Sequence, residues 1–537
     1  MGCTVVNGRD GIRVADSIQM LGMFFGEAVH DAEQFQKRLI EDPMAFEEIE
    51  REVLALFDRG AGLFLSGLLS KTMAARSFQE RAAQLRDEYA VDLKKGTERM
   101  IQTRTGNGFV SHAITEYCPP KRNQADDSTM PGLDVELSQF GFSGGDSPAV
   151  VSKVARSTAL NPSLEVACQQ LERDGVVLDK SAVDRISSRA AQELLTVRER
   201  DLQAFRDGTL QVTGELTGKT VSVQIDGGRT RTRVSGVDLD TLENLGKTQS
   251  EATGRESMGR SKEQRRRATF QAIWREPKVV IIYVHDSQGR RSKEYRVTID
   301  GTLGDVDDMT EIVAMHLHRL GAASAASICF NSDGAIWIWD RIATILSLAK
   351  IPASVMIHQV LDVYHACENL HKAVDELMPP TTERAATYRA LRSTLRDGNW
   401  TSVIANLENM MNEQLGMADS SVNGFKETRR VIEYLRRHGN RGHLNYSTFR
   451  VMGLPLGSGS IESAIRRVVN LRMKGNGIFW KEQRAEEMLM LRATILSDRW
   501  DENRLRAKRA LQANGKLSLP AYLTPKSDAQ QPTSKTQ

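Results

Sequence analysis

Three acidic residues that lie far apart in the sequence could together hold divalent cations: Asp226, Asp333 and Glu462. The two aspartates follow apolar runs typical of buried strands, and Glu462 lies near the start of a segment with helical spacing. Carboxylate oxygens are preferred ligands of Mg²⁺, which usually takes one or two protein carboxylates. Two such ions about 4 Å apart can activate a nucleophilic oxygen and stabilise a leaving oxygen in phosphodiester chemistry.

Each of these acids also has an ordinary structural explanation. Asp226 and Asp333 are both followed by glycine, and Asp-Gly is a common turn signal. Glu462 falls in a first helical turn, where an acid complements the helix dipole and can pair with Arg466 four residues later. The three acids therefore indicate a metal site only in combination with the strands and helix that carry them.

The stretch that leads to Glu462 is rich in glycine and serine. Gly457 and Gly459 allow a tight turn, and Ser460 is predicted to cap a helix with its hydroxyl. The helical spacing that follows predicts one buried face made of Ile461, Ile465, Val468 and Leu471.

Strands and helices alternate between residues 220 and 377. We expect strands at 221–225, 230–234, 279–284, 294–299, 326–330 and 353–357, with helices at 305–320, 341–349 and 362–377. The first two strands are expected to form a hairpin. This order predicts an α/β fold of the RNase H-like kind, a mixed sheet with helices on both faces. Asp226 would then end the first strand, and Asp333 would follow the strand at 326–330, the fourth strand of the core sheet.

The flanking regions are predicted to be mainly helical. The stretch 161–173, a break at Gly175 and a second helix from about 180 fit either a helix-turn-helix or a plain helical hairpin, with Ser181 as a possible cap. The predicted organisation is a mainly helical N-terminal domain with a hairpin around Asn107 (1–147), a candidate DNA-binding helical region (148–215), the first part of the catalytic core (216–378), a helical insertion (379–455), the last core helix (456–500), and a charged helix with a tail (501–537).

Two stretches concentrate positive charge, at 260–267 and 429–450. Such cations can neutralise phosphates, and the interleaved Tyr434, Tyr446 and Phe449 could stack on an unpaired base. The alternatives are solvated arginines and aromatic residues of the core. The residues predicted to contact DNA are Arg265, Arg266, Arg267, Arg429, Arg430, Arg436, Arg437, Arg441, Arg466, Arg467, Arg472 and Lys474.

Asp362 and His365 are three residues apart, a spacing that places both on one side of a helix. They could assist the predicted site or form a solvated polar face. Other catalytic patterns are absent from the sequence, because it contains neither a G-x-S-x-G elbow nor a nucleotide-binding P-loop.

Composition limits the class of protein. The formal net charge of the 537 residues is +3, so positive charge is local rather than global. The 5 cysteines contain no C-x-x-C pair, which favours a reducing compartment over a disulfide scaffold or a cysteine-rich zinc site. We recognise no run approaching a membrane span and no signal-peptide core, so we expect a cytoplasmic protein.

Several segments resemble the signature blocks of DDE transposases from bacterial insertion sequences, with most similarity to the ISKra branch, a distant relative of Mutator-like elements. The resemblance covers roughly residues 149–500, and its C-terminal block is the most specific. The segments are Val223-Gln224-Ile225-Asp226-Gly227-Gly228-Arg229, Trp274-Arg275-Glu276-Pro277-Lys278, 332–340, Asp362-Val363-Tyr364-His365, Leu454-Pro455-Leu456-Gly457-Ser458-Gly459-Ser460-Ile461-Glu462-Ser463, 466–474 and Phe479-Trp480.

The resemblance implies DNA strand cleavage and joining by an RNase H-like core with a helical insertion. It implies Asp226, Asp333 and Glu462 as catalytic residues and ligands of two Mg²⁺ ions, which Mn²⁺ could replace. Asp362 and His365 would correspond to an auxiliary motif of Mutator-like relatives. The implied partners are terminal-repeat and target DNA and further copies of the chain at the bacterial nucleoid. A domesticated relative that binds DNA without cutting it is the alternative.

Overall fold

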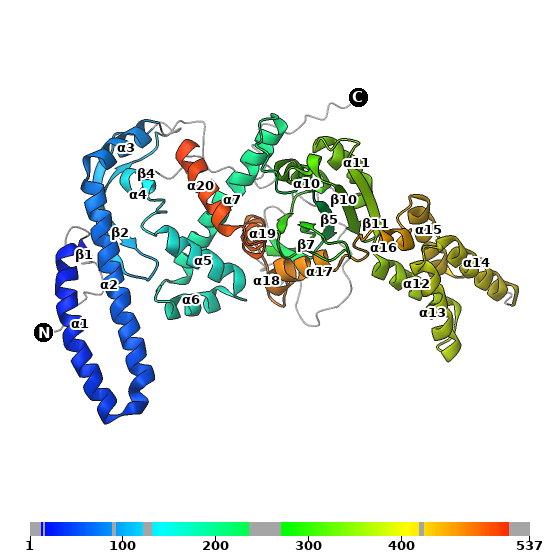
Figure 1. Ribbon diagram of the computed structural model, residues 1–537, viewed down its shortest axis with the longest axis horizontal. Helices are drawn as coiled ribbons and strands as arrows, with labels where there is room; N and C mark the ends of the chain where they lie inside the picture. The colour runs from blue at the N-terminus through cyan, green and yellow to red at the C-terminus, as the bar shows by residue number, and fades with distance from the viewer. Residues whose placement is uncertain are drawn as a thin grey trace, which may run out of the picture. The chain divides into compact units, whose positions relative to one another are not determined.

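The computed structural model describes residues 12–13, 17–88, 93–121, 132–235, 270–417 and 424–514. By the clustering of contacts, the chain forms two compact units (Figure 1). The first consists of Met1–Arg198 and Asp501–Pro520, and the second of Glu199–Trp500 and Ala521–Gln537.

The first unit begins with long helices followed by a small sheet. The helices are α1 (Ser17–Glu41), α2 (Phe46–Ala74, preceded by the short 3-10 helix η2, Pro43–Ala45) and α3 (Arg76–Asp87). The strands are β1 (Ile12–Arg13), β2 (Thr97–Arg104), β3 (Val110–Cys118) and β4 (Leu133–Asp134). Strands β2 and β3 pair antiparallel around Asn107, which confirms the predicted hairpin.

Helices α4 (Val135–Gln139), α5 (Pro148–Leu160), α6 (Leu164–Arg173), α7 (Lys180–Arg206) and α20 (Trp500–Asn514) follow the sheet or close the described chain. The predicted helix, break and second helix are present as α6 and α7. The backbone N–H of Val166 donates to Ser163, which caps α6. The predicted cap at Ser181 is wrong, because the Asp179 side chain accepts the N–H of Ala182 instead.

One helix of this unit lies in a stretch, Pro43–Ala74, that is long and apolar enough to cross a membrane by length and composition alone. The expectation that no run approaches the length of a membrane span therefore needs correction. A single helix of this kind is weak evidence for a membrane span, because helices of soluble proteins pass the same test.

The second unit contains a mixed five-stranded sheet. Its strands are β5 (Thr220–Gly227), β8 (Lys278–Val284), β9 (Thr298–Thr302), β10 (Ser327–Ser332) and β11 (Met356–Leu361). They are ordered β11-β10-β5-β8-β9. Strands β5, β10 and β11 run parallel, whereas β8 is antiparallel to both β5 and β9. The second unit is therefore mixed α/β.

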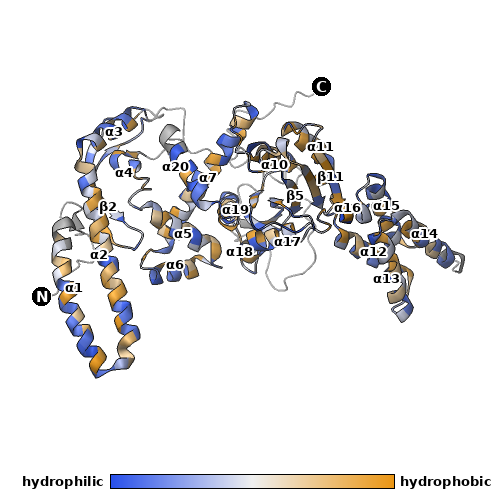
Figure 2. Cartoon of the chain, viewed as in Figure 1, coloured by the Kyte–Doolittle hydropathy of each residue, from blue (hydrophilic) through white to orange (hydrophobic). Residues whose placement is uncertain are grey.

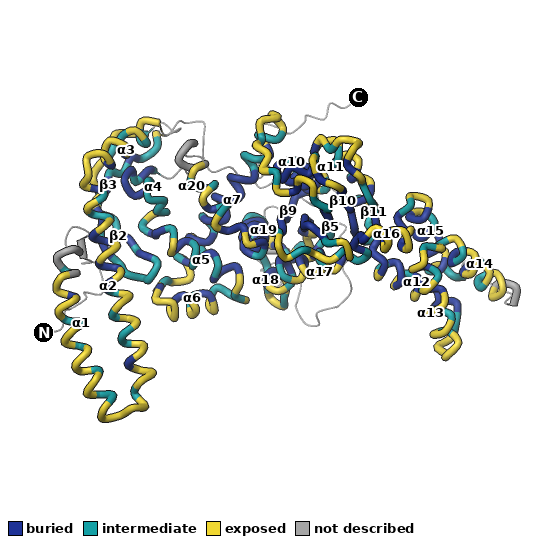
Figure 3. The backbone as a smooth tube through the Cα atoms, in the orientation of Figure 1, coloured by how far each residue is buried: buried dark blue, intermediate teal, exposed yellow. Residues whose placement is uncertain are grey.

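Both faces of this sheet are covered by helices, as expected. Alternate residues of β8 point to opposite faces: Val280 and Ile282 join one buried cluster, and Val279 and Ile281 join the other. Figure 2 and Figure 3 show the apolar, buried strands. The first cluster includes α10 (Val306–Leu320), α11 (Ile336–Leu348) and α12 (Val363–Leu377), and the second includes α17 (Gly459–Ile465) and α19 (Glu482–Leu496). A short 3-10 helix, η3 (Ala322–Ser324), follows α10.

Three strand predictions need correction. Strand β6 (Thr230–Ser235) pairs with β7 (Phe270–Arg275) in a separate two-stranded sheet, not with β5. The chain leaves the main sheet at Gly228, whose N–H donates to Pro277. Strand β9 starts at Thr298 rather than 294. Strand β11 starts at Met356 rather than 353, because the N–H of Val355 closes a turn onto Pro352.

The segment between α12 and α17 is helical, as predicted. It contains α13 (Thr382–Arg396), α14 (Trp400–Met417), α15 (Lys426–Asn440) and α16 (Tyr446–Val451). Tyr434, Tyr446 and Phe449 are all buried in the main core cluster. These aromatic residues therefore stabilise the insertion and are not available to stack on a base.

Candidate active site

The three predicted acids lie on different elements of the second unit. Asp226 is the second-last residue of β5, Asp333 directly follows β10, and Glu462 lies in the first turn of α17. Strands β5 and β10 are parallel neighbours, so their carboxyl ends meet at one edge of the sheet. Helix α17 packs against β5 and β8.

The electrostatics of Asp226 indicate that Asp333 and Glu462 lie near it. Burial raises the pKa of its carboxyl to about 6, and the negative charge of Asp333 is the second cause. Glu462 raises this pKa further. The N–H of Gly227, which donates at 2.6 Å, and the nearby His365 lower it. Asp226 therefore lies within electrostatic reach of Asp333, Glu462 and His365.

Glu462 takes part in a tighter group with Asp362 and His365. Its Oε1 lies 3.1 Å from the Ser458 hydroxyl and 3.7 Å from Nε2 of His365. One ligand atom from each of Asp362, His365 and Glu462 lies within 4.8 Å of the others, a spacing that could hold a metal ion. Of the three predicted metal ligands, this group contains only Glu462.

Asp362 is completely buried and works as a structural link. Its Oδ1 accepts the N–H groups of Tyr364 at 2.5 Å and His365 at 3.0 Å, which caps α12. Its Oδ2 accepts the N–H of Ser458, next to the start of α17. This carboxylate thereby fixes the helix that carries His365 relative to the helix that carries Glu462.

Two buried amides with a similar role were missed from the sequence. Gln224, two residues before Asp226, accepts the N–H of Ile461 at 3.0 Å and donates to the carbonyl of Gly457 at 3.2 Å. Asn331 donates to the carbonyl of Pro455 at 3.0 Å. Both are fully buried. The sequence signal that could have identified them was a polar residue inside an apolar strand.

The helix around Glu462 differs from the prediction in two respects. Helix α17 begins at Gly459 after Ser458, so Ser460 is not its cap. Beyond α17 the chain continues through a π-helical turn, η4 (Arg466–Asn470), into α18 (Leu471–Met473). The wider turn shifts the buried face, which exposes Leu471 and buries Arg472 and Met473.

A pocket of about 300 Å³ adjoins Asp333 and His365. Helix α15 contributes Arg430 and Arg437, seven residues apart and therefore on the same helix face. Arg430 pairs with Glu427 and donates to Asn369 at 2.7 Å. Arg437 is exposed and has no ion pair among the described residues. Cationic groups therefore line one side of a space next to the acids.

Several other predicted DNA contacts are engaged within the protein. Arg436 pairs with Glu408 at 2.7 Å and with Glu433, and Arg441 lies 3.3 Å from Asp340.

Arg472 is buried over the Trp480 ring, and burial lowers its pKa, so its predicted DNA contact is wrong. The positions of the remaining predicted residues are as follows: Arg429, Arg466 and Lys474 are exposed, Arg467 is partly buried, and Arg265, Arg266 and Arg267 lie outside the described residues.

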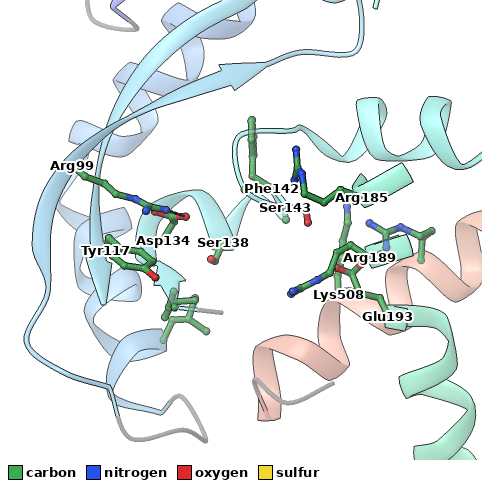
Figure 4. Close-up of a pocket in the computed structure, with 16 residues that line it drawn as sticks. Arg99, Tyr117, Asp134, Ser138, Phe142, Ser143, Arg185, Arg189, Glu193 and Lys508 are labelled. Atoms are coloured by element: carbon green, nitrogen blue, oxygen red, sulfur yellow. Dashed lines mark hydrogen bonds and ion pairs between the residues drawn. The ribbon is translucent and has the colours of Figure 1, made fainter. Parts of the chain in front are cut away.

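A second basic pocket, of about 390 Å³, lies in the first unit. Figure 4 shows Arg185, Arg189 and Lys508 on its helical wall. On the strand wall, Arg99 pairs with Asp134 at 2.7 Å, and its guanidinium lies 3.8 Å from the centroid of the Tyr117 ring.

Positive charge exceeds negative charge in this second pocket. Glu193 contacts both Arg189 and Arg504, so one carboxylate serves two cations. Burial and the neighbouring Arg504 lower the pKa of Lys508. Arg185 has no ion pair within the described part of the chain. The pocket is therefore suited to a negatively charged ligand.

No protein-family model and no curated protein sequence matches this chain.

Proposed function

We propose that this protein is a DNA transposase that cleaves element-end phosphodiesters and joins them to target DNA. The observation that carries the proposal is that Asp226 of β5 lies within electrostatic reach of Asp333 and Glu462, and that Asp333 lines a pocket with Arg430 and Arg437. Acids suit metal-assisted phosphodiester chemistry, and adjacent arginines suit a phosphate-bearing substrate.

The strand order supports an RNase H-like core for this transposase. In that fold, three antiparallel strands are followed by two parallel strands on the other side of the first. The order β11-β10-β5-β8-β9, with its observed directions, agrees with that arrangement. The helical insertion before Glu462 agrees with the transposase branch that the sequence resembles.

The donor set fits Mg²⁺, because Asp226, Asp333 and Glu462 offer carboxylate oxygens. Asp226 would contribute to both ion positions, and Asp333 and Glu462 to one each. When bound, the two ions would supply charge stabilisation at the attacking and leaving oxygens. Mn²⁺ is expected to substitute, since it accepts the same ligands.

The other residues of the site would position the substrate and the acids. Arg437 and Arg430 would neutralise non-bridging phosphate oxygens of the DNA strand. His365, 3.7 Å from Glu462, can hold a proton or donate a hydrogen bond at that carboxylate. Asp362 and Gln224 would act through Glu462, by fixing the start of its helix.

The proposed partners are terminal-repeat DNA, target DNA and further copies of the chain in a bacterial cytoplasm. The basic pocket of the first unit supports the DNA assignment, because its excess positive charge would bind a phosphate. The candidate helix-turn-helix formed by α6 and α7 is a second route to DNA.

The test uses the full-length protein with labelled duplexes that carry both flanks of its gene. We expect Mg²⁺-dependent nicks at discrete positions in the flanks, followed by joining to a second duplex. Tight, specific binding without cleavage would favour a domesticated DNA-binding protein. Cleavage without joining would favour a nuclease.

A further inference from the structure

Helix α2 presents apolar side chains to solvent along half of its length. Leu54, Phe57, Phe64 and Leu68 have relative exposures of 61%, 60%, 57% and 53%, and Ala61 between them is also exposed. Figure 2 and Figure 3 show that the long helices α1 and α2 both contain segments that are apolar yet exposed. An exposed apolar stripe of this length is typical of a surface that binds a protein or a membrane.

The spacing of the stripe identifies the kind of partner. Leu54, Phe57, Ala61, Phe64 and Leu68 alternate steps of three and four residues, which is the a/d pattern of a coiled-coil seam. This stripe does not serve the packing of α2 on α1. That contact uses other positions, such as Gly60, where any side chain would collide with Phe24. The stripe is thus a second seam, suited to another helix.

Packing on the sheet argues against a lipid environment for this helix. Gly62 lies against Phe109, and the Ser66 hydroxyl bonds to Ser111 of β3 at 3.1 Å. Ser111 in turn bonds to the Thr103 hydroxyl at 2.9 Å. The middle of α2 is therefore attached to a polar hairpin. A bilayer would have to exclude that hairpin, because open sheet edges do not occur in its hydrocarbon core.

We propose that this seam, defined as Leu54, Phe57, Ala61, Phe64 and Leu68, pairs α2 with α2 of a second copy in antiparallel orientation. The stripe can meet itself, because a bulky Phe64 of one copy fits over the small Ala61 of the other. An isologous contact of this kind closes as a two-fold dimer.

Charge at the helix ends selects the antiparallel orientation. Glu47 and Glu50 near the start of α2 are exposed and have no ion pair among the described residues, and the same holds for Lys71 in its last turn. In the register that sets Phe64 over Ala61, antiparallel pairing places Lys71 of one copy opposite Leu54 of the other, about one helical turn from Glu50. Parallel pairing would bring like charges together, which costs stability.

The first experiment measures the oligomeric state of the full-length protein without DNA, by sedimentation velocity and light scattering. We expect a dimer whose dissociation constant rises at least about 30-fold in the Phe57→Glu/Phe64→Glu variant, the loss typical of central interface residues. The matched control is Ile40→Glu, which adds a charge at a 75% exposed apolar residue of α1 outside the seam. Circular dichroism checks that all variants keep their helices.

A monomeric wild-type protein at about 100 µM, well above the dissociation constants of specific interfaces, would overturn the proposal. So would a Phe57→Glu/Phe64→Glu variant that dimerises as well as Ile40→Glu. Flotation of wild-type protein with neutral phosphatidylcholine vesicles, lost in the double variant, would assign the stripe to lipid instead. Because no arm uses DNA, failure here is distinct from failure of the transposase proposal.

A second experiment tests orientation by disulfide cross-linking. The antiparallel seam predicts faster cross-linking in a mixture of Ala61→Cys and Phe64→Cys chains than in either alone, with wild-type protein as the control for native cysteines. Faster cross-linking of Ala61→Cys with itself would overturn the antiparallel orientation.

Discussion

The carboxyl of Asp226 has a perturbed pKa. Burial and the charge of Asp333 raise its pKa to about 6, from a usual value of 3.8. An acid whose pKa is raised by folding stabilises the folded state in its protonated form. This stabilisation is complete below the unfolded pKa and is lost as the pH rises through about 6.

The first prediction concerns the variant Asp226→Asn without divalent ions. At pH 8 its free energy of unfolding should be about 1–3 kcal/mol higher than that of wild type. The substitution removes a buried carboxylate and its repulsion with the neighbouring acids. At pH 4 the difference should nearly vanish, because the wild-type carboxyl is then protonated. Urea unfolding at both pH values measures this. An equal difference at both would contradict the electrostatic explanation.

A second prediction concerns the effect of Mg²⁺ on thermal stability. Millimolar Mg²⁺ should raise the melting temperature of wild-type protein at pH 8, because bound cations relieve the repulsion. The rise should be smaller in Asp226→Asn. An equal rise in both proteins would place the bound ion elsewhere.

The sequence identified individual residues where a local pattern marked them. Asp226 and Asp333 were recognisable because each follows an apolar run. Gln224 was not, because its partners, Gly457 and Ile461, lie more than 200 residues away in the sequence. The DNA contact of Arg472 was predicted wrongly because a π-helical turn rotates this residue into the core. No residue pattern indicated that turn.

At the scale of elements, the link between β5 and α17 determines the position of Glu462. Gln224→Leu should leave the carbonyl of Gly457 and the N–H of Ile461 without their partner, at a cost of about 1–3 kcal/mol. We expect the variant to fold yet lose most DNA cleavage, while it binds DNA as wild type does. Gln224→Glu, which keeps one acceptor for Ile461, should retain more activity than Gln224→Leu. Full activity in Gln224→Leu would show that this link does not position the acid.

The proposed contribution of α15 to DNA binding can be tested by comparing two neighbouring arginines. Arg437→Ala should weaken binding to all duplex sequences and reduce the slope of log K against log salt by about 0.9, the value for one phosphate contact. Arg436→Ala is the matched control, because Arg436 is already paired with Glu408 and Glu433. Equal effects of the two variants would contradict a specific role for the pocket.

Sequence patterns predicted the existence of elements better than their partners. The hairpin around Asn107 was predictable because both strands and the turn are adjacent in the chain. The partner of β6 was not, because β7 begins 35 residues after β6 ends. Residue alternation indicates a strand without indicating which edge it joins.

At the scale of the whole molecule, each of the two units carries a basic pocket. Arg185→Ala/Lys508→Ala should weaken binding to duplexes of any sequence, because two cations are removed from the pocket of the first unit. Lys94→Ala/Lys95→Ala removes the same charge from exposed positions that do not line that pocket. Fluorescence anisotropy at several salt concentrations compares them. Equal losses would indicate an effect of net charge rather than a binding site.

Contacts between helices that lie far apart in the sequence were the least predictable feature. Helix α20 was expected to be a charged extension after the core, yet most of it belongs to the first unit. Its Arg504 pairs with Glu193 of α7, 311 residues earlier. A buried ion pair between distant helices leaves no periodic signal, so sequence reasoning could not place it.

The proposed function requires that Asp226, Asp333 and Glu462 carry out metal-dependent DNA cleavage and joining. Asp333→Asn tests it most directly, because asparagine keeps the oxygen that accepts the N–H of Ala335 while it removes the charge. We predict that this variant binds the gene's flanking DNA with wild-type affinity but neither nicks nor joins it in Mg²⁺, and that Glu462→Gln behaves alike. Near-normal strand transfer by soluble Asp333→Asn protein in Mg²⁺ would show that Asp333 is not a catalytic residue.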